Sequence, residues 1–87
     1  MAKKIICRLQ PFLMEQDIYV YENGNKLDAT KATSQDLINT IISLADRYNI
    51  KSVDFSGPAQ YSRGIGNQLQ EASLVRYNQK FSINYIN

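Results

Sequence analysis

The sequence predicts one α/β domain in which a mixed sheet is flanked by two helices, in the order strand, strand, strand, helix, strand, helix, strand. Two patterns predict it. Short segments are rich in β-branched and aromatic residues, and two longer segments carry apolar residues at every third or fourth position. A chain of 87 residues allows one domain with a small core. We therefore expect a single domain over residues 1–87.

The first three strands are expected between residues 4 and 31. Near the start of residues 4–13, apolar residues occur at both odd and even positions, which is typical of a strand covered on both faces. Pro11 ends or bends this strand. Residues 17–21 are β-branched and aromatic, and residues 22–25 supply the positive-φ positions of a tight hairpin turn. Residues 26–31 then form a short, polar returning strand.

The first helix is expected to start at Thr33 and Ser34, with a hydroxyl at the cap and Asp36 in the first turn. It should run to about Tyr48, because Asn49 is a good C-terminal breaker. Its broad apolar face should cover the sheet. The members of that face are Leu37, Ile38, Ile41, Ile42, Leu44, Ala45 and Tyr48.

The second half of the chain predicts a strand over 50–55, closed by the turn residues 56–58, and a helix over 60–77. Gly64 and Gly66 weaken that helix by about 1 kcal/mol each relative to Ala, so each of them needs a reason.

Residues 81–86 alternate between polar and apolar and predict the last strand. We expect it at an edge of the sheet or paired with a second copy of the chain, since an exposed edge is suited to pairing. A homodimer is therefore one expected assembly.

Charge and cysteine content exclude several classes of protein. The net charge of +2 comes from scattered residues, so no basic block marks a nucleic-acid or membrane surface. Cys7 is the single cysteine, which leaves no internal disulfide and fits a reducing compartment. The basic start has too short an apolar run for a signal peptide, and no segment approaches the roughly 20 apolar residues of a membrane span. We expect a cytoplasmic protein without a membrane partner.

The order of elements resembles the core of the ribonuclease H-like fold. The segment Val53–Ile65 (VDFSGPAQYSRGI) also resembles small uncharacterised proteins of bacteriophages and low-GC bacteria. The second resemblance implies a protein encoded by a phage or a mobile element.

Active ribonuclease H-like enzymes hold two divalent ions with acids on the first strand, the first helix and the fourth strand. Residues 5–12 contain no acid. Asp36 or Asp46 could stand for the helix acid and Asp54 for the later strand acid. The resemblance therefore implies the fold with an incomplete metal site, and we expect no catalytic residue, bound metal or cofactor.

The junction between the fourth strand and the second helix, residues 54–64, is the expected binding site. Glycine permits close backbone approach, a helix start offers free N–H groups, and Arg63 could pair with a phosphate or a carboxylate. Ordinary turn chemistry is the alternative, and the spacing of Gly64 and Gly66 matches no phosphate-binding motif. The predicted binding residues are Ser56, Gly57, Gln60, Tyr61 and Arg63.

Six tyrosines form a second candidate feature. Tyr19 and Tyr21 share one face of their strand, and Tyr85 could add a ring, making an aromatic platform for bases or a partner protein. No lysine or arginine lies near these tyrosines in the sequence, so the sequence favours core packing.

The leading hypothesis is a small non-enzymatic binding protein of a phage or mobile element that acts through protein–protein contacts. The alternative is a nucleic-acid-binding module with a catalytically dead ribonuclease H-like fold, and a third is an unusual nuclease built on Asp54. The nucleic-acid hypothesis uses tyrosine stacking together with Lys51, Arg63, Arg76 and Lys80, although solvated surface charge is the ordinary role of such residues.

Overall fold

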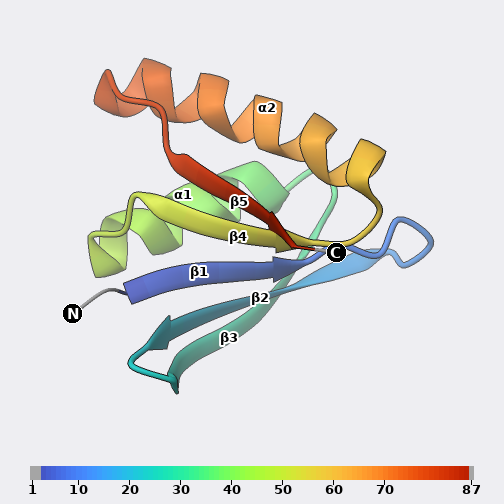
Figure 1. Ribbon diagram of the computed structural model, residues 1–87, viewed down its shortest axis with the longest axis horizontal. Coiled ribbons are helices and arrows are strands. Elements are labelled where there is room, and N and C mark those ends of the chain that lie inside the picture. The colour runs from blue at the N-terminus through green and yellow to red at the C-terminus, as the bar shows by residue number, and fades with distance from the viewer. Residues whose placement is uncertain (1–2, 87) are drawn as a thin grey trace.

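Five strands and two helices follow one another in the computed structural model, which describes residues 3–86 (Figure 1). The strands are β1 (Lys3–Arg8), β2 (Glu15–Glu22), β3 (Asn25–Thr33), β4 (Ser52–Ser56) and β5 (Ser82–Ile86), and the helices are α1 (Leu37–Tyr48) and α2 (Ala59–Tyr77). The sheet order is β3-β2-β1-β4-β5. The pairs β1–β2 and β2–β3 are antiparallel, whereas β1–β4 and β4–β5 are parallel. The predicted α/β class and element order are confirmed.

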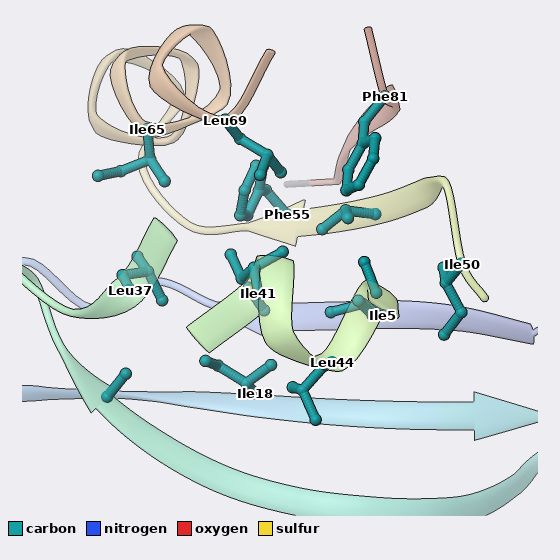
Figure 2. Close-up of a cluster of buried hydrophobic side chains, with 14 of the residues drawn as sticks. Ile5, Ile18, Leu37, Ile41, Leu44, Ile50, Phe55, Ile65, Leu69 and Phe81 are labelled. Carbon is teal, nitrogen blue, oxygen red and sulfur yellow. The ribbon is translucent and has the colours of Figure 1, made fainter. Parts of the chain in front are cut away.

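Both helices cover the same face of the sheet. Ile5 is in register with Val20 on β2 and with Val53 on β4, and all three side chains are fully buried. Directly paired residues share a face, so these positions define the covered face. Figure 2 shows the core side chains between the strands and the helices. Those labelled there are Ile5, Ile18, Leu37, Ile41, Leu44, Ile50, Phe55, Ile65, Leu69 and Phe81.

The opposite face of the sheet carries no helix in the part of the chain described, residues 3–86. On β1 this open face presents Lys4, Ile6 and Arg8, of which Ile6 is half-buried and the two basic residues are exposed. The prediction that β1 is covered on both faces is therefore wrong for these residues. The extra apolar residue that suggested it, Ile6, lies on the open face.

Two element boundaries differ from the predicted ones. The first strand ends at Arg8 rather than near Leu13, and the residues after it form a loop. The first helix begins at Leu37 because Thr33 is still paired in β3, and its hydroxyl bonds both the amide and the carboxylate of Asp36. That carboxylate therefore lies before the helix and not in its first turn.

Other local predictions are confirmed. Asn49 ends α1 in the left-handed region with φ 56°, and Asn23 and Gly24 take positive φ in the β2–β3 hairpin. The predicted apolar face of α1 packs into the core. The last strand, β5, lies at an edge of the sheet, opposite β3. Among residues 3–86 neither helix is long and apolar enough to cross a membrane.

Candidate functional site

The loop between β1 and β2 exposes three consecutive large apolar side chains. Phe12 is 97% exposed, Leu13 52% and Met14 87%. Isolated apolar residues on a surface are ordinary, whereas a contiguous exposed apolar group is typical of interaction surfaces, so this loop is a candidate site. We call residues 11–14 the apolar loop. The sequence does not reveal this exposure, because Phe12 and Leu13 continue the apolar pattern of the first predicted strand, although Pro11 is a signal that the strand ends.

A buried side chain holds the apolar loop in place. Gln16 is 1% exposed, and its amide oxygen accepts a hydrogen bond from the backbone N–H of Gln10 at 2.5 Å. Its amide nitrogen donates to the carbonyls of Gln10 at 3.0 Å and Leu13 at 3.2 Å. The side chain thus bonds to the backbone of Gln10, just before the apolar loop, and of Leu13 within it. Its contacts fix the loop from inside while the apolar side chains point outward.

The predicted junction lies directly beside this loop, since the carboxyl ends of parallel β1 and β4 meet at one end of the sheet (Figure 1). The N–H of Leu9 donates to the carbonyl of Ser56 at 2.8 Å. Gly57 has φ +135°, and a side chain there would overlap the carbonyl of Leu9. Ser56 and Gly57 therefore pack against Leu9, which precedes the apolar loop by two residues, and glycine is required by this close approach.

The first turns of α2 carry a shallow hollow of about 480 Å³. We call it the α2 hollow. Two of the predicted binding residues, Gln60 and Tyr61, lie in its lining, and the hydroxyls of Tyr61 and Ser34 are 3.1 Å apart. The full lining is Pro58, Gln60, Tyr61, Gly64, Ile65 and Gln68, with no charged residue among them.

The two glycines of α2 differ in whether a contact within the chain requires glycine. A side chain at Gly66 would overlap the hydroxyl of Tyr85, so close packing of the helix on β5 requires this glycine. A side chain at Gly64 would meet no other atom within 4 Å. Nothing within the described molecule requires glycine at position 64, and it lines the α2 hollow.

Arg63 is separated from the other predicted site residues. Its guanidinium carbon lies 4.6 Å from the ring centroid of Tyr85, on the side of α2 that faces β5. At about 100° per residue, Arg63 and Tyr61 are roughly 160° apart around the helix. The structure therefore brings together Ser56, Gly57 and the apolar loop, places Gln60 and Tyr61 in the hollow, and leaves Arg63 elsewhere.

The open face of the sheet carries an aromatic ring between two cations. Arg8 and Lys26 lie 5.8 Å and 5.1 Å from the ring centroid of Tyr19, and the ring of Tyr21 is 6.3 Å away. The prediction of core packing is therefore wrong for Tyr19, because strand pairing brings basic residues that are distant in the chain to its ring. Core packing holds for the other four, Tyr48, Tyr61, Tyr77 and Tyr85.

The acids expected of a nuclease are far apart in the fold. Asp54 lies on the open face at 4% exposure, where it accepts hydrogen bonds from Lys4 at 3.1 Å and Asn84 at 3.2 Å. Asp36 and Asp46 lie near opposite ends of α1, on the covered side of the sheet. Among residues 3–86, no three His, Cys, Asp or Glu side chains are close enough together to hold a metal ion. The structure does not bring Asp54 together with either helix acid.

Hydrogen bonding and burial shift the pKa values of several titratable groups, among them Asp46 and Cys7. Asp46 accepts hydrogen bonds from Tyr77 and Arg76, which lower the pKa of its carboxyl. Burial raises the pKa of the Cys7 thiol. The Asp46 group joins the end of α1 to the end of α2, so its role is to fix the two helices together.

The arrangement of the whole chain matches a solved structure. It is similar to a protein of Bacteroides thetaiotaomicron that is described as having an actin-like ATPase fold and unknown function, with a TM-score of 0.70 and 17% identity. The match covers 98% of this chain. The protein has the ribonuclease H-like fold of actin-like ATPases.

The same match covers only 32% of the Bacteroides chain, so this protein spans about a third of that length. No protein-family description matches the sequence, and no curated protein matches it. At 17% identity the likeness shows the fold alone.

Proposed function

We propose that the protein is a non-enzymatic binding protein that acts through protein–protein contacts. The observation that carries the proposal is the apolar loop, in which Phe12, Leu13 and Met14 are held outward by the buried side chain of Gln16. A fixed loop loses little conformational freedom on binding, which makes it a better anchor than a flexible one. The resemblance of residues 53–65 to bacteriophage proteins supports a partner in a phage or its host.

The size of the loop limits what it can do alone. Burying three large apolar side chains contributes roughly 5–9 kcal/mol, and association costs about 4–15 kcal/mol of lost freedom. The loop by itself therefore gives weak binding at best. A stable complex needs further contact, and the junction and the α2 hollow beside the loop provide the nearest surface.

The test is affinity capture from the lysate of a low-GC bacterium after nuclease treatment, with three forms of the protein. We expect the wild type and Val75→Asp to retain one and the same partner, and Phe12→Asp to lose it. Val75 is the matched control because it is 86% exposed on α2, in the helix's last turns and away from the loop. A partner retained equally by Phe12→Asp would overturn the proposal.

A second candidate function is binding of single-stranded nucleic acid on the open face. It is favoured by the position of Tyr19 between Arg8 and Lys26, neither of which forms an ion pair with another residue in the described range 3–86. An aromatic ring can stack on a base while the cations contact phosphates.

This candidate predicts affinity for single-stranded DNA or RNA that falls steeply with salt, because neutralised phosphates release counterions. We expect Tyr19→Ala to abolish such binding and Phe12→Asp to leave it unchanged. Binding that is insensitive to salt, or that survives Tyr19→Ala, would exclude the open face as a nucleic-acid site.

A further inference from the structure

Gly64 weakens α2, although no contact among residues 3–86 requires glycine at this position. Glycine inside a helix is destabilising by about 0.5–1 kcal/mol relative to alanine. A Cβ at position 64 would meet no atom within 4 Å, and a longer side chain would extend over the α2 hollow, beside Tyr61 and Gln68 at spacings of three and four residues. Its absence keeps the hollow open, which indicates that the hollow receives a group from outside the chain.

The chemistry of the hollow points to an uncharged, largely apolar occupant. Its lining contains Pro58, Tyr61 and Ile65 together with amides, and no charge. A cavity of about 150 Å³ holds one benzene molecule. The hollow, at about 480 Å³, has room for a phenyl ring and a second apolar side chain. Phe12 and Met14 of the apolar loop are an uncharged pair of this kind.

We infer that the occupant of the α2 hollow is the apolar loop of a second copy of this chain, so that two copies exchange loops in a two-fold dimer. The inference rests on the proposed function, in which the apolar loop is the binding surface, and it names the partner. One contact then accounts for two separate features of the surface, the outward Phe12 and the unexplained Gly64.

The placement of the two surfaces suits reciprocal exchange. The loop follows β1, the hollow begins at Pro58 directly after β4, and Leu9 bonds Ser56 where the two segments meet. The β1–β2 loop and the start of α2 therefore lie toward one end of the molecule (Figure 1). A two-fold axis near that end inserts each loop into the other copy's hollow, and the interface closes instead of continuing as a chain of copies.

The contact area reaches what a stable dimer needs. An aromatic side chain buries roughly 150–250 Å². The two Phe12 rings thus bury about 300–500 Å² between them, and the walls of the two shallow hollows add a smaller area. Leu13 and Met14 from both copies bring the total to the region of 1,200 Å², the lower limit for a specific interface.

The first test is sedimentation of the wild type and three variants from micromolar to near-millimolar protein. We expect the wild type to dimerise, and Phe12→Asp and Gly64→Leu to weaken dimerisation roughly tenfold to a hundredfold. Gly64→Leu places an apolar side chain over the hollow, and nothing lies within 4 Å of the new Cβ. Asn67→Leu is the control, since Asn67 is exposed on the same helix outside the hollow lining, and it should dimerise like the wild type.

The second test locates the contact by cysteine cross-linking. A copy with Phe12→Cys is mixed under oxidising conditions with a differently tagged copy carrying Gln68→Cys, a residue of the hollow lining. We expect a covalent heterodimer from this mixture and none when Val75→Cys replaces Gln68→Cys. The native Cys7 is fully buried and should not interfere.

The outcomes separate this inference from the proposed function. A wild type that stays monomeric at every concentration overturns the inference. So does a dimer that Gly64→Leu leaves intact, if Phe12→Cys also fails to cross-link to Gln68→Cys. If Phe12→Asp nevertheless loses a captured protein of different mass, the proposed function stands with another partner. If Phe12→Asp retains the captured partner, both the inference and the proposed function are wrong.

Discussion

Alanine should stabilise the fold at Gly64 but not at Gly66 of α2. At position 64 the new methyl meets nothing within 4 Å, so Gly64→Ala should stabilise the fold by about 0.5–1 kcal/mol through the helix propensity alone. In a domain of this size, 1 kcal/mol raises the midpoint of thermal unfolding by about 4–8 °C. We therefore expect a visibly higher midpoint for this variant.

At position 66 the same methyl meets Tyr85. It would overlap the hydroxyl oxygen and lie 2.9 Å from the ring carbon that carries it. Overpacking of this kind costs about 1–3 kcal/mol, which cancels or exceeds the gain of about 1 kcal/mol in helix propensity. Gly66→Ala should therefore be less stable than Gly64→Ala by about 1–3 kcal/mol, the cost of the overlap itself.

Chemical denaturation of both variants, alone and with Tyr85→Leu, measures this coupling. The smaller side chain removes the overlap, so Gly66→Ala should become stabilising in that background while the effect of Gly64→Ala stays the same. If Gly66→Ala stabilises the wild type as much as Gly64→Ala does, the packing of α2 on Tyr85 described above is wrong. Gly64 and Gly66 would then no longer differ in whether a contact within the chain requires glycine.

Three further expectations follow from the core and the titratable groups. Ile41→Ala should cost about 2–5 kcal/mol in denaturant unfolding, because Ile41 is fully buried under the sheet, and an unchanged midpoint would refute its place in the core. Hydrogen bonds from Tyr77 and Arg76 lower the pKa of the Asp46 carboxyl in the folded protein. The stabilisation by Asp46 should therefore be present at neutral pH and be lost as the pH falls below 3.8, the ordinary pKa of this carboxyl. A difference in thermal midpoint between wild type and Asp46→Asn that persists in stronger acid would contradict this. The Cys7 thiol should resist alkylation at pH 8 until the protein is unfolded, because burial raises its pKa, and rapid labelling of the native protein would show that β1 is accessible.

The element order could be predicted from the sequence because periodicity is a local property. The apolar repeat of α1, the breaker Asn49 and the β-branched strands are each readable within a dozen residues. The start of α1 was misplaced because Thr33 resembles a helix cap in sequence but pairs with Glu15 across the sheet. Tertiary pairing prevailed there over a local signal.

The candidate site could be predicted only in part. The junction after β4 was recognisable from its glycine and proline, and the structure places Gln60 and Tyr61 in a hollow there. The apolar loop was missed because exposure cannot be read from residue type, and Phe12 looks the same in sequence whether it is inside or outside. The cations around Tyr19 come from other strands, so no sequence window contained them.

The central claim is that the apolar loop is the protein-binding surface. A photo-reactive phenylalanine analogue at position 12, with the same analogue at position 75 as the control, tests it most directly in living cells. We expect irradiation to give a discrete covalent adduct from position 12 and none from position 75, and an adduct of twice the 10.0 kDa chain would identify a second copy as the partner. No adduct at position 12, or equal adducts at both positions, would contradict the claim.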